Sequence, residues 1–226
     1  MSDRYSVIFI LICILTIFSV INAGCRGKKG DQKATSDIQS HLTDSTYIFN
    51  GVNLEGCEVT NFGPQGPVTV SGGEIILGMG DGLTGITYKR KFPEINYEVT
   101  LEAMRVAGND IFCGLTFPVG SDPCTLIVGG WGGTVVGLSS IDGKDASENE
   151  TTRYMNFEKS RWYSVRLKVT VKKIEAWIDD EKVIDILING KRLSVRSEVG
   201  LSRPFGIASW CTTAALRNIK VISVQP

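Results

Sequence analysis

Residues 162–171 read WYSVRLKVTV, and every second residue from Tyr163 to Val171 is apolar. The residues between them are polar and include the cations Arg166 and Lys168. Because successive side chains of a β-strand point to opposite faces, this alternation predicts a strand with one face in the core and the other in water. Sheets with one solvated face are typical of antiparallel architectures.

Two shorter apolar stretches follow this segment closely. Residues 174–178 come directly after the pair 172–173, and residues 182–186 come after the acidic turn 179–181. Short polar turns between apolar runs connect antiparallel neighbours. The whole region therefore predicts a three-stranded antiparallel meander.

The same period of two, or a short apolar run between turn residues, recurs along the rest of the chain. Further strands are expected at residues 73–77, 83–90, 97–103, 111–117, 124–128, 134–138, 206–210 and 215–224. Gly, Pro, Asn or Asp clusters separate most of them, and no long amphipathic helix is evident. Many short strands with frequent turn signals predict an all-β fold, an antiparallel β-sandwich or jelly roll.

Charge and composition exclude several classes of function. The chain has 226 residues, with 24 Lys and Arg against 24 Asp and Glu, and a single His. A neutral chain lacks the basic excess that releases counterions from nucleic acid, so no nucleic-acid partner is expected. The single His41 lies in a polar segment, which argues against Ser-His-Asp triads and most zinc sites.

The N-terminus has the features of an export signal. Arg4 precedes an apolar run at 7–21, and the small residues Ala23 and Gly24 precede Cys25. This flank resembles the bacterial lipobox, in which the Cys is lipidated, although Asn22 departs from the usual aliphatic residue. An uncleaved anchor and ordinary signal cleavage are the alternatives, and all three place the following chain outside the cytoplasm.

The expected organisation follows from these segments. Residues 1–24 are predicted to be a signal peptide, residues 25–46 a lipid-anchored flexible tether, and residues 47–226 a single β-sandwich domain. The tether is polar and cannot bury enough apolar surface to offset its ordering entropy. The protein is thus expected in the cell envelope, held to a membrane through Cys25.

Four cysteines remain once Cys13 in the signal and Cys25 at the lipid site are set aside. They are Cys57, Cys113, Cys124 and Cys211. In an oxidising compartment they could form up to two disulfides, or they could be small buried apolar side chains. The spacing does not decide between these alternatives.

The order of several short motifs resembles a known family. Residues 47–56, YIFNGVNLEG, are similar to the LFNGKDLSGW opening of the 3-keto-disaccharide hydrolase domain family. Matching segments follow in the same order at 97–102, 162–165, 174–185, 206–208 and 216–219. The resemblance implies a concanavalin A-like (lectin/glucanase) sandwich and chemistry on glycosides, with carbohydrate as the partner.

Three departures from the family pattern bear on activity. Cys57 stands where the opening Trp is expected, residues 126–133 lack the polar Y-E-x-Q-x-x-D segment, and residues 208–211 lack Q-x-H-G. Both a hydrolase of 3-keto-glycosides and a non-catalytic chain that keeps only the fold therefore remain open.

A polar turn near the family's polar face carries the candidate site. Glu102 and Asp110 are the carboxylates that could act as catalysts, since glycoside hydrolysis uses a facing pair across a cleft. Arg105 could clamp a sugar hydroxyl or carboxylate, and Asn109 lies in the same turn. The alternative for Glu102 is an ordinary exposed carboxylate on the polar face of its strand.

Trp131 lies between glycine pairs in the segment 129–133. Its indole could stack on a pyranose ring at a binding site. The alternative is a bulge or corner at which Trp131 fills the core, since Trp is highly buried on average.

Two other motifs have weaker support. The acidic loop 142–150 makes Ca²⁺ the one candidate ion, although a solvated loop is the alternative and no other cofactor is expected. Residues 80–85 satisfy G-x-G-x-x-G, but a strand follows instead of the helix that binds pyrophosphate. A β-hairpin turn is expected there.

Three functions are therefore compatible with the sequence. The domain could bind or cleave a modified sugar, bind glycans without catalysis, or serve as a structural or interaction scaffold braced by cysteines. Fold alone does not decide among them.

Overall fold

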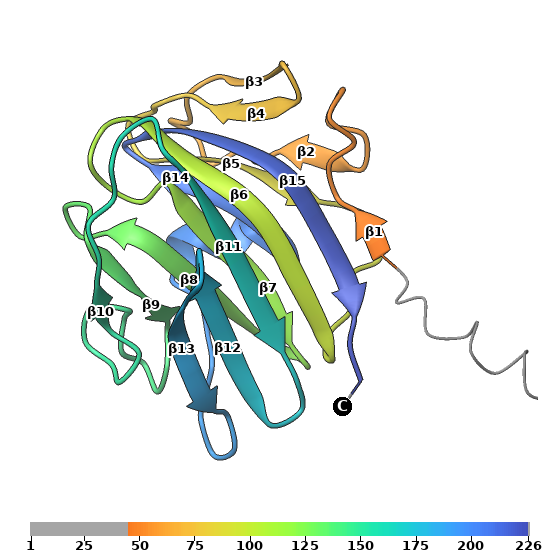
Figure 1. The fold of residues 1–226 in the computed structure, drawn as a ribbon, viewed down its shortest axis with the longest axis vertical. Helices are drawn as coiled ribbons and strands as arrows, with labels where there is room; N and C mark the ends of the chain where they lie inside the picture. The colour runs from red at the N-terminus through yellow and green to blue at the C-terminus, as the bar shows by residue number, and fades with distance from the viewer. Residues whose placement is uncertain (1–44, 226) are drawn as a thin grey trace, which may run out of the picture. The chain divides into compact units, whose positions relative to one another are not determined.

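Two antiparallel β-sheets lie face to face in the computed structural model, in which residues 45–225 are described (Figure 1). The strands are β1 (Ser45–Tyr47), β2 (Cys57–Val59), β3 (Val68–Ser71), β4 (Glu74–Leu77), β5 (Leu83–Tyr88), β6 (Tyr97–Ala107), β7 (Cys113–Val119), β8 (Asp122–Gly130), β9 (Val135–Ser139), β10 (Arg153–Tyr154), β11 (Trp162–Val169), β12 (Lys173–Ile178), β13 (Glu181–Leu187), β14 (Phe205–Trp210) and β15 (Thr213–Ser223). A 3-10 helix, η1 (Ser197–Ser202), precedes β14. The predicted all-β sandwich is confirmed.

The sheets differ in strand order. The eight-stranded sheet A runs β13-β12-β11-β6-β15-β4-β3, with β1 paired to β15, and the seven-stranded sheet B runs β10-β9-β8-β7-β14-β5-β2. In Figure 1 sheet A faces the viewer and sheet B lies behind it. Each sheet combines strands that are far apart in the sequence, as expected for a sandwich.

The alternating stretch forms β11, between β6 and β12 in sheet A. Val165 pairs with Leu101 and Ile178, and Leu167 pairs with Val99 and Ala176. The antiparallel pairs β11–β12 and β12–β13 confirm the predicted meander. One face of this region is buried against sheet B, because Tyr163, Val165, Leu167 and Val169 of β11 are buried together with every second residue of β6 from Tyr97 to Ala103.

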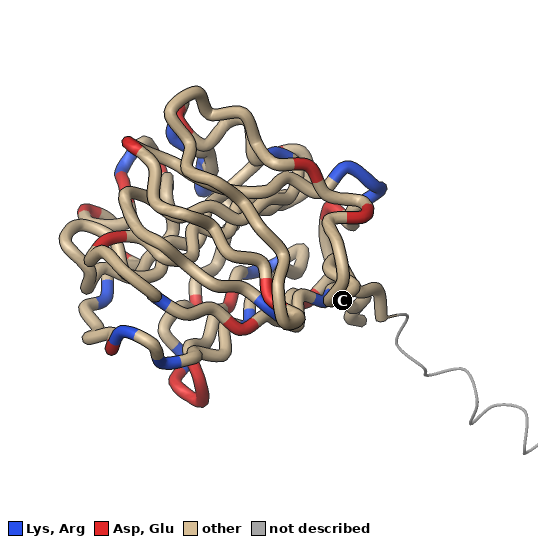
Figure 2. The backbone as a smooth tube through the Cα atoms, turned by 90° about the horizontal axis from the view of Figure 1, so that it is seen from above, with Lys and Arg blue, Asp and Glu red and all other residues tan. Residues whose placement is uncertain are grey.

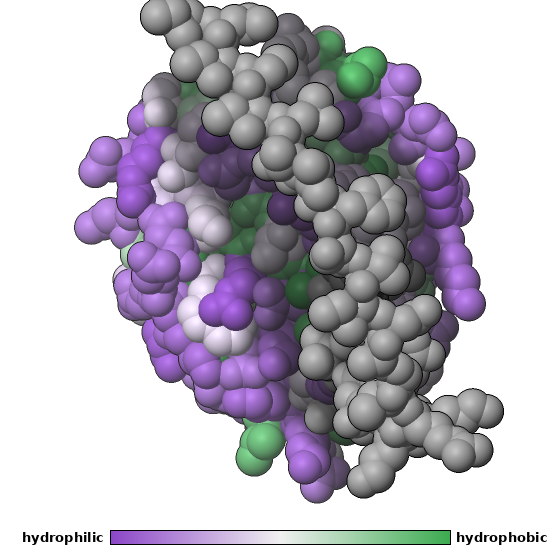
Figure 3. Space-filling model, turned by 45° about the vertical axis from the view of Figure 1, so that its right-hand side comes forward, coloured by the Kyte–Doolittle hydropathy of each residue, from purple (hydrophilic) through white to green (hydrophobic). Residues whose placement is uncertain are grey.

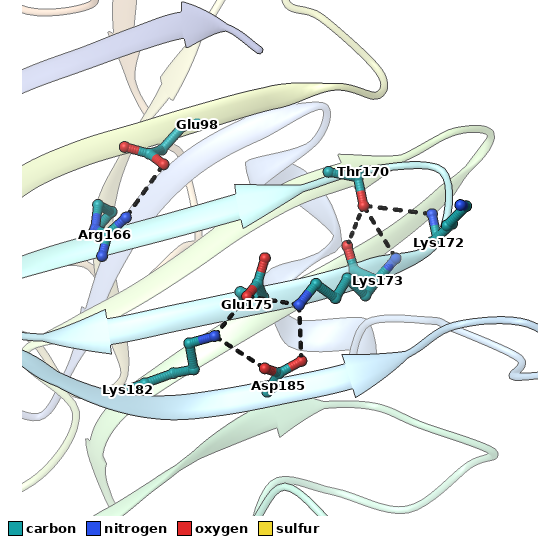
Figure 4. Close-up of polar contacts among 8 residues, drawn as sticks. All are labelled: Glu98, Arg166, Thr170, Lys172, Lys173, Glu175, Lys182 and Asp185. Carbon is teal, nitrogen blue, oxygen red and sulfur yellow. Dashed lines mark hydrogen bonds and ion pairs between the residues drawn. The ribbon is translucent and has the colours of Figure 1, made fainter. Parts of the chain in front are cut away.

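The outer face of the meander is charged, and several of its charges form ion pairs (Figure 4). Glu175 accepts from the Nζ atoms of Lys173 and Lys182 at 2.8 and 2.7 Å, and Asp185 contacts the same two lysines at 3.3 and 2.9 Å. The carboxylate of Glu175 is well shielded by these two cations, while the exposed pairs contribute little stability. This is the solvated face that the alternation predicts.

Charged residues of both signs are also distributed over the rest of the described chain. Figure 2 shows Lys and Arg interspersed with Asp and Glu along the chain. Where described residues are visible in Figure 3, hydrophilic side chains cover most of the surface. The core between the sheets holds the large apolar side chains, among them Tyr97, Phe112, Phe117 and Phe205.

Several local expectations are corrected. The glycine-rich segment 80–85 is not a hairpin turn, because it connects β4 in sheet A to β5 in sheet B. Strand β1 begins at Ser45, before the predicted start of the domain at residue 47, and it pairs with β15. Strands β1, β2, β3 and β10 were not predicted, because short exposed strands carry little apolar pattern.

The cysteines of the described region are free. Cys113 and Cys124 are completely buried in the core, whereas Cys211 is exposed. Burial raises the pKa of each buried thiol to about 12, so both stay protonated and inert. Of the two alternatives left by the sequence, the buried apolar role therefore applies to Cys113 and Cys124, and no disulfide braces the described sandwich.

The predicted signal peptide, the lipid site at Cys25 and most of the tether lie outside the described residues. Within residues 45–225 no helix is long and apolar enough to cross a membrane.

Candidate functional site

A cleft of about 230 Å³ opens on the outer face of sheet B. Alternation along β8 defines this face, because Cys124, Leu126 and Val128 point into the core while Thr125 and Ile127 point the other way. The lining residues come from four strands of sheet B (β5, β8, β9 and β14), from adjoining turns and from the segment around η1. They are Leu83, Asp110, Ile111, Thr125, Ile127, Trp131, Ser139, Arg196, Glu198, Val199 and Trp210.

Small residues occupy the middle of sheet B. Ala208 on β14 pairs with Gly85 on β5 and with Gly114 on β7. A Cβ atom on Gly85 would lie only 2.8 Å from the Cβ of Ala208 and 2.5 Å from the carbonyl oxygen of Ile207. Larger side chains would therefore clash at Gly85, and the row of small residues leaves room above the sheet.

Two tryptophans stand at the cleft with much of their surface in water. Trp131 is 43% exposed and Trp210 is 37% exposed. Trp131 occupies the turn between β8 and β9 with a left-handed backbone (φ 48°), and Trp210 ends β14. Trp131 therefore does not fill the core, and this alternative from the sequence is wrong. Both indoles line the cleft.

Arg105 holds the turn that carries Trp131. Its guanidinium is buried, with 4% exposure, and donates to the carbonyl oxygens of Asp110, Gly129 and Gly133 at 3.2, 3.2 and 3.0 Å. It also lies over the ring of Phe112, 5.0 Å from the centroid. Burial lowers the pKa of Arg105 below its ordinary value, but a guanidinium remains cationic. Arg105 thus clamps both ends of the turn from beneath.

Asp110 links the two tryptophan turns. Its carboxylate accepts from the backbone N–H groups of Ile111 and Gly132 at 2.8 and 3.2 Å. Its own N–H donates to the Thr212 hydroxyl at 3.1 Å, and the Trp210 N–H donates to the carbonyl of Ile111 at 2.9 Å. The position of both indoles therefore depends on residues 110–111.

The opposite wall of the cleft comes from the segment before β14. Arg196 contacts Asp145 at 2.5 Å and Glu198 at 2.7 Å. The hydrogen bond from Arg196 is the main reason that the pKa of Glu198 falls to about 2, so this carboxylate is a weak base. Asp145 also accepts from the hydroxyls of Ser139 and Ser140 at 3.0 and 3.2 Å.

Glu102 lies elsewhere. It points outward from β6 in sheet A, where it accepts from Arg217 Nε at 2.9 Å and from the side-chain amide of Asn218. The hydrogen bond from Arg217 lowers the pKa of Glu102 below its ordinary value. The structure therefore does not bring Glu102 and Asp110 together.

Of the other residues named from the sequence, Asp110 and Trp131 share the cleft, while Arg105 lies beneath it and Asn109 is exposed beside it. Sequence reasoning missed Trp210, Arg196 and Glu198. An aromatic residue at the end of the predicted strand 206–210 was a usable signal for Trp210. The pairing of Arg196 with Asp145, 51 positions away in the sequence, left no local signal.

The acidic loop 142–150 is held by cations and hydrogen bonds. Besides the contact of Asp145 with Arg196, Glu150 contacts Lys191 at 2.5 Å, and the carboxylate of Asp142 accepts from the Arg192 N–H at 2.9 Å. Across residues 45–225 no group of three or more His, Cys, Asp or Glu side chains is arranged to hold a metal ion.

A known protein family matches most of this chain. The family model described as 3-keto-alpha-glucoside-1,2-lyase-like domain matches residues 44–222. A search of curated proteins finds no match.

Solved structures share the sandwich at low sequence identity. A candidate glycosyl hydrolase from Parabacteroides distasonis is 14% identical with a TM-score of 0.53, covering 80% of this chain and 94% of that chain. The apo form of Crh5 transglycosylase is 14% identical with a TM-score of 0.56, covering 81% of this chain and 85% of that chain. At such identity these structures show a shared fold.

Because Arg105 holds the Trp131 turn, we expect its replacement to lower the stability of the fold. Arg105→Met should lower the free energy of unfolding by about 3 kcal/mol, because it leaves several buried carbonyls without donors. Urea unfolding measures this, and amide exchange should become faster at residues 129–133. Arg203→Met is the control, since exposed Arg203 contacts only the Gly200 carbonyl among the hydrogen bonds of the described chain. Equal stability of the two variants would contradict the clamp.

Proposed function

The chain belongs to the 3-keto-alpha-glucoside-1,2-lyase-like domain family, and from this premise we propose that it binds a carbohydrate in the cleft of sheet B. The family resemblance noted in the sequence is thereby confirmed. The observation that carries the proposal is the pair of exposed indoles, Trp131 and Trp210, on one cleft.

The chemistry of the lining suits a sugar. An indole presents a flat apolar face to the C–H groups of a pyranose ring, while its N–H remains available to a polar partner. The Asp110 carboxylate and the hydroxyls of Thr125 and Ser139 lie in the same cleft and can bond sugar hydroxyls. Few polar groups on an apolar lining are typical of small-ligand sites.

The cleft is also held in place before any ligand arrives. Arg105 clamps the Trp131 turn, and residues 110–111 tie that turn to the end of β14. Binding then costs little further ordering of these loops, which favours affinity.

Catalysis is a second candidate, supported by Asp110. In the elimination that the family description names, a base removes the proton on C2, which the ketone at C3 makes acidic. The electron pair forms the C1–C2 double bond while the bond from C1 to the glycosidic oxygen breaks, and that oxygen takes a proton from water. Asp110 is a better candidate for this base than Glu198. The Asp110 carboxylate accepts hydrogen bonds only from backbone N–H groups, whereas the hydrogen bond from Arg196 makes Glu198 a weak base.

Binding is tested on a glycan array followed by calorimetry. Trp131→Ala and Trp210→Ala should each weaken binding about 10- to 100-fold, because each removes an aromatic platform. Tyr154→Ala is the matched control, since Tyr154 is a 73% exposed aromatic residue that does not line the cleft. If no glycan binds, the carbohydrate proposal fails and a structural or interaction role is favoured.

Catalysis is tested with a 3-keto-α-disaccharide by following release of the free sugar. The intact protein should release it, and Asp110→Asn should lower kcat about 100-fold or more because it removes the base. Glu102→Gln should keep its activity, because Glu102 lies on sheet A. No release by the unmutated protein, or undiminished release by Asp110→Asn, would reject catalysis through Asp110.

We further propose that the domain is carried by a lipoprotein of the cell envelope, on the periplasmic or extracellular side. The support is the apolar run 7–21 followed by Ala23, Gly24 and Cys25. Radiolabelled palmitate should be incorporated, and Cys25→Ser should abolish the incorporation while Cys13→Ser does not. Label that persists in Cys25→Ser would reject lipidation at this residue.

A further inference from the structure

The charges that line the cleft are mostly negative. Asp110 and Glu198 are its carboxylates, and Arg196 is the only cation among the lining residues in the described chain. Asp145 does not itself line the cleft, but its carboxylate lies 2.5 Å from Arg196 and pairs with it. A ligand in the cleft therefore meets more negative than positive groups.

Arg196 has little capacity left for an acidic ligand. Its Nη1 contacts Asp145, and its Nη2 and Nε donate to Glu198 at 2.7 and 3.2 Å. Each of the three guanidinium nitrogens thus already has a carboxylate partner. These bonds use three of its five N–H groups, so an incoming carboxylate would reach only the remaining two and would lie beside Asp145 and Glu198, which carry the same charge.

Asp110 has no such cation beside its carboxylate. Its two oxygens accept backbone N–H groups, and no salt bridge joins it to a basic side chain within residues 45–225. The guanidinium of Arg105 donates to the backbone carbonyl of Asp110 instead, and at 4% exposure it lies beneath the turn. Arg105 attracts the Asp110 carboxylate from beneath but forms no ion pair with it, so no side-chain cation of the described chain occupies its oxygens on the ligand side.

We propose that the cleft accepts uncharged and amino saccharides and excludes acidic ones, such as uronic acids and phosphorylated sugars. This selectivity rests on the proposed carbohydrate binding and names its substrate class. An acidic group would approach Asp110 as a like charge on a partly desolvated surface, with no free cation to compensate it. An ammonium group would instead form a salt bridge with Asp110.

The test uses glycans that differ in charge on one backbone. Calorimetry at low ionic strength compares oligogalacturonate with its neutral methyl ester, and chitosan oligomers with the N-acetylated chitin oligomers, using the intact protein. The acidic form should bind at least about tenfold more weakly than its ester, and chitosan at least as tightly as chitin, with both differences shrinking at high salt.

Two variants assign the effect to the cleft. Asp110→Asn should reduce the charge discrimination by about tenfold, measured as the ratio of the acid and ester dissociation constants, so that any loss of affinity common to both glycans cancels. Asp122→Asn should leave it unchanged, because Asp122 is the first residue of β8, at the β7–β8 hairpin, and does not line the cleft. A methyl ester that binds no better than oligogalacturonate, or chitosan that binds more weakly than chitin, would overturn the proposed selectivity. Failure of every glycan to bind, neutral ones included, would instead contradict the carbohydrate function itself.

Discussion

The shape of the cleft depends on one buried cation. Arg105 donates to carbonyls at both ends of the Trp131 turn and to the carbonyl of Asp110. A buried arginine without a carboxylate partner is costly, and here the carbonyl dipoles and the ring of Phe112 compensate it. These carbonyls belong to two different loops, so a single side chain holds both loops in the conformation that a ligand would meet.

The sandwich supplies the surface on which that clamp acts. Sheet A buries the apolar face of β11, and on its outer face Glu175 is paired with Lys173 and Lys182. The outer face of sheet B is only partly covered, and the small residues Gly85, Gly114 and Ala208 lie side by side in the middle of the sheet. The proposed binding cleft therefore lies on sheet B, and solved structures share the sandwich at 14% identity.

Local pattern predicted the strands best where burial alternates along them. Strands β6 and β11 were found because one face of each is buried, whereas β1 and β10 are short and exposed and left no pattern. The segment 80–85 was predicted as a hairpin turn, but a crossover between sheets uses the same glycines, so local sequence could not separate the two. Asp110 and Trp131 were identified as candidates from a polar turn and a glycine-rich context.

The amino-acid order alone established an all-β sandwich and its family, because the period of two and the sequence of short motifs are properties of neighbouring residues. Tertiary structure decided that Asp110, Trp131 and Trp210 share one cleft while Glu102 faces away on the other sheet. It also decided that Arg105 supports the cleft from beneath and that Arg196 is engaged by Asp145. These outcomes depend on which strands become neighbours across the sandwich, and residues far apart in the chain carry no local record of that choice.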